Sequence, residues 1–116
     1  MAKTTASFVR KTALALPEAE EKETWGEATF RVKDKMFATL GADGTQAGVK
    51  ASLENQARLV ARDPETFSVS HYTGRFGWVT VQVARVERDE MRELLVDAWR
   101  RTAPKKLVAA YDAEQK

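Results

Sequence analysis

The spacing of apolar residues along the chain changes from a helical period to strict alternation. Residues 8–16 carry apolar side chains at helical spacing, and Pro17 ends that run. From residue 24 to residue 51 the period is two, as expected of half-buried strands. The pattern therefore predicts one helix followed by a meander of short antiparallel strands. Turns are expected at Gly26-Glu27, at the hairpin Lys33-Asp34-Lys35 and at Ala42-Asp43-Gly44.

The second half of the chain alternates helical and strand patterns. A helix is predicted over residues 53–62, because Ser52 can cap it and Asp63-Pro64 stops it. Residues 66–70 indicate a strand. A longer strand follows the loop 71–77, with Val79, Val81 and Val83 on one face and Trp78, Thr80 and Gln82 on the other.

The last third of the chain predicts two helices. After Asp89 as a cap, apolar residues recur at helical spacing from Met91 to Trp99. Pro104 can open a final short helix. No repeat or linker interrupts the order of elements, so a single domain is expected over residues 1–116. The expected fold class is α+β, a two-layer sandwich in which helices cover one face of an antiparallel sheet.

Composition narrows the class of protein without identifying a partner. The chain has 116 residues, of which 43% are hydrophobic and 31% charged, and a net charge of +2. That charge is too small to indicate a polyanion by itself. The lack of cysteine excludes disulfides and thiolate chemistry and favours a cytoplasmic location. Arg10 and Lys11 interrupt the only candidate signal peptide, and no segment has the length of a membrane span.

No motif for catalysis, cofactor binding or metal binding stands out. His71 is the only histidine and has no partner motif beside it. The glycines of Gly41–Thr45 fit a hairpin turn and not a phosphate-binding loop. The acidic run Glu18–Glu23 is expected to be a solvated segment leaving the first helix. We therefore expect no enzyme activity, no cofactor and no metal.

The outward side of the predicted sheet is the most informative surface. Alternation places Arg31, Lys33 and Lys50 outward, together with Trp78, and Arg75 lies in the preceding loop. Cationic side chains neutralise phosphates, and an aromatic plane can stack on bases or sugars. Two alternatives stay open: Trp78 packs under a loop or helix end, or it lies in a homodimer contact.

Several stretches resemble the MmcQ/YjbR family. They are T-W-G-E-A-T-F-R-V-K-D-K-M-F-A-T-L, G-V-K-A-S, F-S-V-S-H-Y-T-G-R-F-G-W-V-T-V and L-L-V-D-A-W-R-R-T-A-P-K-K-L. The resemblance runs from the first helix to about Tyr111. It implies the CyaY-like fold of bacterial frataxin. Frataxins bind iron through acidic residues that include their first helix, but here that helix carries Lys3, Arg10 and Lys11.

Members of that family are usually named as DNA-binding because of a double wing of β-hairpins. The resemblance therefore implies a non-enzymatic, DNA-binding and regulatory protein, a monomer or weak homodimer. The wings would be the hairpin at Lys33-Asp34-Lys35 and the loop Tyr72–Gly77. The alternative is a module that binds a protein or a small ligand, or dimerises, through the exposed sheet face around Trp78. The residues expected to bind DNA are Arg31, Lys33, Lys35, Lys50, Arg75 and Trp78.

Overall fold

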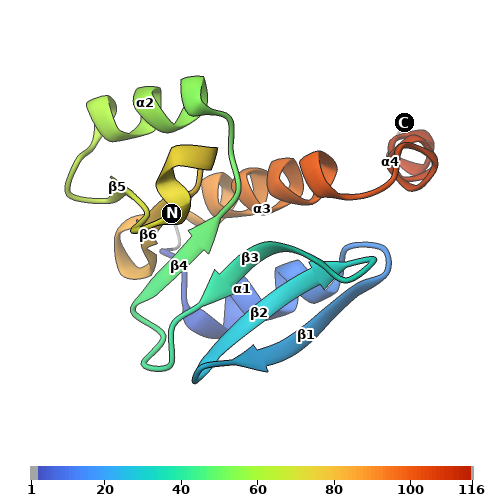
Figure 1. Ribbon diagram of the computed structural model, residues 1–116, viewed down its shortest axis with the longest axis horizontal. Coiled ribbons are helices and arrows are strands. Elements are labelled where there is room, and N and C mark those ends of the chain that lie inside the picture. The colour runs from blue at the N-terminus through green and yellow to red at the C-terminus, as the bar shows by residue number, and fades with distance from the viewer. Residues whose placement is uncertain (1–2, 116) are drawn as a thin grey trace.

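A computed structural model describes residues 3–115 as an antiparallel sheet packed against helices (Figure 1). The helices are α1 (Ala6–Leu14), α2 (Leu53–Arg62), α3 (Arg88–Thr102) and α4 (Lys105–Glu114). The strands are β1 (Ala19–Thr24), β2 (Glu27–Val32), β3 (Lys35–Leu40), β4 (Gln46–Val49), β5 (Phe67–Val69) and β6 (Val79–Gln82). Two 3-10 turns, η1 (Thr73–Phe76) and η2 (Val83–Arg85), flank β6. The predicted α+β class is confirmed.

The six strands form one sheet in the order β1-β2-β3-β4-β6-β5, and every neighbouring pair is antiparallel. Two tight hairpins build its first half. The loops Trp25-Gly26 and Lys33-Asp34 have two residues each, and all four have positive φ. Such loops match the twist of antiparallel strands, which explains why β1, β2 and β3 follow one another directly.

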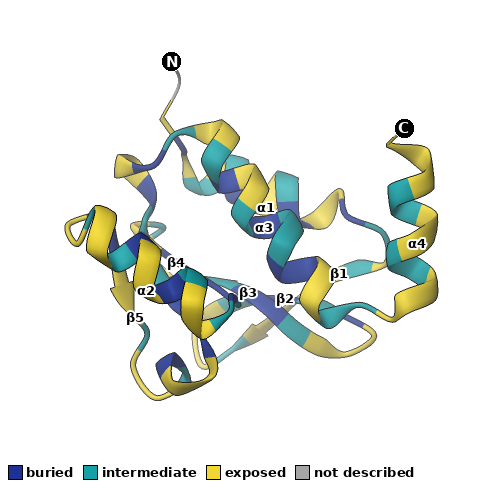
Figure 2. Ribbon diagram, turned by 90° about the horizontal axis from the view of Figure 1, so that it is seen from above, coloured by how far each residue is buried: buried dark blue, intermediate teal, exposed yellow. Residues whose placement is uncertain are grey.

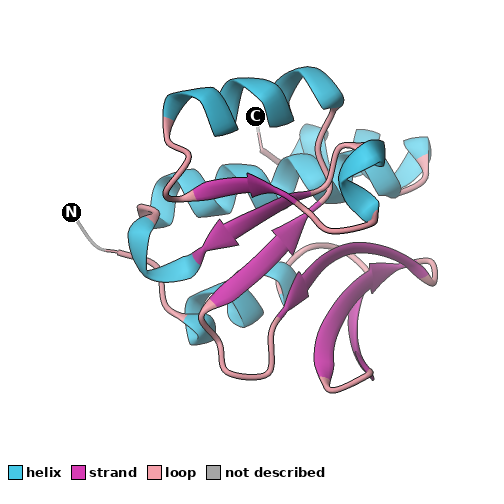
Figure 3. Ribbon diagram, turned by 60° about the vertical axis from the view of Figure 1, so that its left-hand side comes forward, coloured by secondary structure: helices cyan, strands magenta, loops and turns pink. Residues whose placement is uncertain are grey.

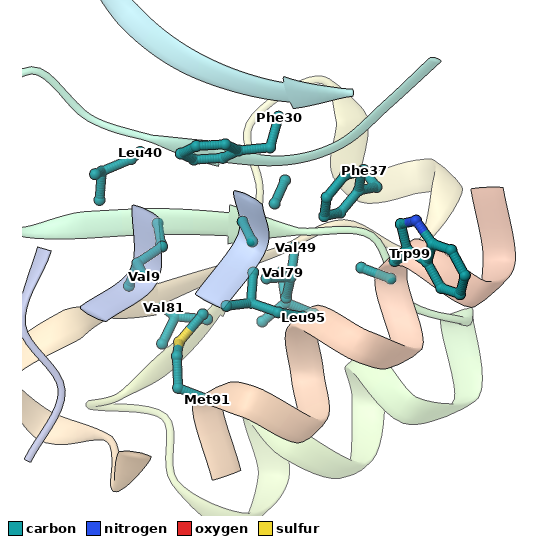
Figure 4. Packing of buried hydrophobic residues seen from close by; sticks show 14 of the residues in the cluster. Val9, Phe30, Phe37, Leu40, Val49, Val79, Val81, Met91, Leu95 and Trp99 are labelled. Atoms are coloured by element: carbon teal, nitrogen blue, oxygen red, sulfur yellow. The ribbon is translucent and has the colours of Figure 1, made fainter. Parts of the chain in front are cut away.

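Helices α1 and α3 lie along one face of the sheet, as Figure 2 shows, and the hydrophobic core lies between the two layers. Figure 4 shows the inward side chains of the central strands, among them Val49 and Val79, against Met91 and Leu95 of α3. All four are fully buried. The expected two-layer arrangement follows, because each element buries one apolar face against the other layer.

The indole of Trp99 joins α3 to the rest of the fold. It is fully buried, and its Nε1 donates a hydrogen bond of 3.0 Å to the backbone carbonyl of Pro17, at the end of the first helical segment. Tyr111 of α4 lies 5.1 Å from it, measured between ring centroids. Within residues 3–115, no helix is both long enough and apolar enough to cross a membrane.

Most predicted boundaries agree with the structure. Thr5 caps α1 and Ser52 caps α2, each by accepting a backbone N–H through its side-chain hydroxyl. The alternation of β6 is also as predicted, since Val79 and Val81 are buried on the helix side. The cap of α3 is Glu87 and not Asp89, so this helix begins one residue before the predicted cap.

The acidic run near the first helix is mostly exposed to solvent, as expected, but the prediction missed its strand structure. It forms β1, which pairs with β2 from Ala19 opposite Val32 to Thr24 opposite Glu27. Sequence alternation gives no sign of this strand because its residues are polar and mostly exposed. Charged side chains are common on edge strands, where they discourage pairing with another sheet.

Candidate functional site

The face of the sheet opposite α1 and α3 is open and hollowed. Figure 3 shows how far the strands twist from one edge of the sheet to the other. Along this face lies a cleft of about 1060 Å³, which we call the sheet-face cleft. Its floor comes from outward-facing residues of four strands, Thr29, Met36, Thr39, Gly48 and Thr80, and from Trp78.

Trp78 lies on the outward face, as predicted, but only 8% of it is exposed. Its indole rests against Gly48 of β4, where an added Cβ would lie 3.7 Å from Trp78 Cε3 and 2.6 Å from Thr39 Oγ1. Glycine at this position therefore allows the indole and the Thr39 hydroxyl to close over the strand. The expectation of an exposed stacking plane at Trp78 is wrong, because the residue is buried within this chain.

Two other aromatic side chains stand at the rim of the sheet-face cleft. Trp25, in the β1–β2 turn, is 98% exposed, and Tyr72, in the β5–β6 loop, is 83% exposed. Both have positive φ, 54° at Trp25 and 63° at Tyr72. Bulky residues rarely adopt that conformation, because the side chain crowds the backbone. Two solvent-exposed aromatic residues with strained backbone conformations therefore lie beside one cleft.

Most of the polar groups in the cleft are uncharged. Its hydroxyl-bearing side chains include Thr24, Thr29, Thr39, Ser70, Thr73 and Thr80. The cleft also contains two carboxylates, from Glu27 and Asp43. Thr45 donates its backbone N–H and its hydroxyl to Asp43 Oδ1, at 3.0 and 2.8 Å, and these bonds lower the pKa of Asp43. No Lys or Arg of residues 3–115 lines this cleft.

The residues predicted to form a cationic sheet face do not gather there. Arg31 is the only one of these cations on an outward strand position, and it donates to Thr29 Oγ1 and to the backbone carbonyl of Asp34. Lys33 lies in the β2–β3 turn and forms an ion pair of 2.6 Å with Glu18. Lys35 is paired with Val32 across the turn, which places it toward the other side of the sheet. The predicted single cationic face is therefore wrong.

The remaining two predicted cations, Lys50 and Arg75, lie near the same end of the sheet as the β2–β3 turn. Lys50 directly follows β4, and its backbone N–H donates to the carbonyl of Phe37 on β3. The turn η1 ends at Gly77, where an added Cβ would lie 2.1 Å from the backbone oxygen of Ala51. The Arg75 loop thus packs against the chain that immediately follows Lys50.

Sequence reasoning missed the two rim aromatics as site residues. Trp25 is part of the Trp25-Gly26 pair and Tyr72 belongs to a predicted wing, but periodicity cannot show that either ring is exposed. His71 packs edge-on against Tyr72, with ring centroids 4.2 Å apart. No hydrogen bond joins the His71 ring to another side chain in the described part of the chain.

Fold and surface together define a small α+β domain with one helix-covered and one open, concave sheet face. The chain belongs to the YjbR family, whose model matches residues 14–101. A crystal structure of Deinococcus radiodurans protein DR2400, described as a DUF419 domain, is similar in fold, with a TM-score of 0.75 at 22% sequence identity. The match covers 83% of this chain and 76% of that chain. No curated protein matches.

Proposed function

We propose that this YjbR domain binds DNA through one end of its sheet and has no enzymatic activity. The observation that supports the proposal is the position of three exposed or half-exposed cations near that end. They are Lys35 at the start of β3, Lys50 after β4 and Arg75 in η1. Together with Lys33 and the aromatic ring of Phe76, we call them the sheet-end surface.

Strand register places these residues at the same end of the sheet. Lys35 pairs with Val32 at the β2–β3 turn, and Val49, the residue before Lys50, pairs with Ala38 of β3. Val49 also pairs with Val79, the first residue of β6, which the η1 loop precedes. Both predicted wings, the β2–β3 turn and the η1 loop, therefore approach the same end of the sheet.

Ion pairing decides which cations are available to phosphates. Lys33 is bound to Glu18, and the neighbouring Asp34 accepts from Lys22 at 2.8 Å, which lowers the pKa of Asp34. Lys35, Lys50 and Arg75 form no ion pair with a carboxylate of residues 3–115. Three available cations support weak binding without strong sequence preference, because phosphate contacts carry no base information.

An exposed aromatic ring takes the role first expected of Trp78. Phe76 is 62% exposed, and the Arg75 guanidinium lies 4.9 Å from its ring centroid. A cation beside an accessible ring combines a phosphate contact with a surface for stacking on a base or sugar.

A non-enzymatic role agrees with the surroundings of His71. His71 is exposed and its ring contacts Tyr72, whereas a catalytic histidine is typically oriented by a hydrogen bond to a third group. In our proposal the protein acts in the cytoplasm as a monomer or weak homodimer, and no step of its function requires a cofactor.

The test is a titration of a fluorescently labelled DNA duplex with the protein at salt concentrations between about 20 and 200 mM. With about three phosphates neutralised, the logarithm of the binding constant should fall with a slope of about −3 against the logarithm of salt concentration. Lys35→Ala and Lys50→Ala should each flatten that slope by about one unit. Phe76→Ala should weaken binding and leave the slope unchanged.

Lys11→Ala is the matched control, because Lys11 is an exposed lysine on α1 and lies outside the sheet-end surface. Helix α1 packs on the sheet face opposite the sheet-face cleft. The variant should bind as the wild type does. Absence of DNA binding at about 20 mM salt, where counterion release contributes most, would refute the proposal.

A further inference from the structure

We infer that the sheet-face cleft is a second, separate binding site, and that its ligand is a neutral oligosaccharide. The inference does not depend on DNA binding, because no Lys or Arg of the described residues belongs to the cleft lining. It rests on three features of the cleft: two exposed aromatic residues with strained backbones, a polar lining of mostly uncharged side chains, and its extent across the sheet.

The rim aromatics contribute little to the fold that holds them. Trp25 is 98% exposed, so burial of its ring contributes almost nothing to stability. Its positive φ also destabilises the folded chain, because a bulky side chain crowds the backbone in that conformation. Tyr72 combines the same two properties. Such rings offer a flat, slightly negative face to a ligand. The faces of sugar rings present C–H groups whose hydrogens are slightly positive and match that surface.

The charges in the cleft argue against both anionic and cationic ligands. A phosphate or carboxylate ligand would face Glu27 and Asp43, and no Lys or Arg of the described residues lines the cleft to pair with it. Asp43 Oδ1 already accepts two hydrogen bonds from Thr45, so only its Oδ2 is open to a cationic ligand. The other carboxylate, Glu27, is exposed, where a single ion pair is weak.

The remaining polar groups suit a ligand with many hydroxyls. A threonine or serine hydroxyl both donates and accepts, as a sugar hydroxyl does. Thr39 Oγ1 lies on the cleft floor beside the Trp78 ring, and Ser70 and Thr80 bond each other there at 2.9 Å. A floor of hydroxyls beside aromatic rings matches the alternation of apolar faces and polar edges in a saccharide.

The positions of the rim residues indicate an extended ligand. Trp25 belongs to the β1–β2 turn and Tyr72 to the β5–β6 loop, and these strand pairs form opposite edges of the sheet. Neighbouring strands lie about 4.8 Å apart, so the two edges are separated by about four spacings, or roughly 19 Å. The two turns also lie at opposite ends of the strands. A ligand that touches both rings must be longer than one sugar ring.

The experiment is a binding screen of the full chain against neutral oligosaccharides of glucose, mannose, galactose and N-acetylglucosamine, of two to six units, followed by calorimetric titration of those that bind. At least one series should bind more tightly as its length grows, and equally well at about 20 and 200 mM salt. Trp25→Ala and Tyr72→Ala should each weaken binding about three- to tenfold, while Trp25→Phe retains most of it.

Phe76→Ala is the matched control, since Phe76 is an exposed aromatic residue close to Tyr72 but outside the cleft lining. It should leave saccharide binding unchanged and weaken only DNA binding, so failure of one proposal is distinguishable from failure of the other. The inference is overturned if no neutral oligosaccharide binds at about 10 mM. It is also overturned if both rim variants bind as the wild type does, or if spermidine or a sulfated saccharide occupies the cleft instead.

Discussion

The side-chain amide of Gln56 donates a hydrogen bond of 2.8 Å to the backbone carbonyl of Trp78. The same Nε2 donates to the carbonyl of Gly74 at 2.7 Å. Gln56 is buried on α2, so this one side chain ties that helix both to the η1 loop and to the residue just before β6. The Tyr72–Gly77 loop contributes Arg75 to the sheet-end surface and Tyr72 to the sheet-face cleft. Gln56 therefore helps to fix the positions of both residues.

Gln56→Leu should destabilise the protein by about 1 to 3 kcal/mol, because the replacement keeps the volume but removes both hydrogen bonds in a buried setting. Amide hydrogen exchange in residues 72–77 should become faster. Chemical denaturation and hydrogen exchange measure the two effects. Arg58→Ala, on the exposed side of the same helix, should change stability by less than about 0.5 kcal/mol. Equal stability of the two variants would show that the amide does not hold the loop.

Val81→Asp should destabilise the fold by several kcal/mol, comparable to its total stability. Val81 is fully buried between β6 and the helical layer, so the change would place an unpaired carboxylate in the core. Ser68→Asp is the matched control, since Ser68 lies on the opposite face, across from Thr80, and is exposed. Its cost should stay below about 1 kcal/mol in chemical denaturation. A similar loss in both variants would contradict the register of β5 and β6.

Thr45→Val should raise the pKa of Asp43 toward the ordinary range of an aspartate. The variant loses the hydroxyl that donates to Asp43 but keeps the backbone N–H bond, so part of the lowering remains. A lowered pKa means that folding gains from the ionised carboxylate at neutral pH, and that this gain is lost as the pH falls through the lowered value, below about 4. An NMR titration of the Asp43 carboxyl measures the shift. An unchanged pKa would contradict the hydroxyl bond.

Local patterns along the chain were enough to predict the α+β class, the limits of most helices and the inward row of β6. These follow from local rules. The Val79 and Val81 row is set by a period of two, and α1 and α2 begin at Thr5 and Ser52 because short polar side chains bond free backbone N–H groups at helix starts. Each such signal lies within a few residues, so it is visible without knowledge of the fold.

Which side chains are exposed and unpaired at the surface depends on the tertiary structure. Alternation placed Trp78 outward correctly, but its indole packs on Gly48 of β4 and only 8% of the residue is exposed. Alternation likewise left Lys33 free, whereas it forms an ion pair with Glu18, the residue just before a strand that the pattern did not predict. Exposure and pairing depend on residues far apart in the chain. A periodic pattern indicates on which face of the sheet a side chain lies. Only the folded sheet determines which other residues contact that side chain.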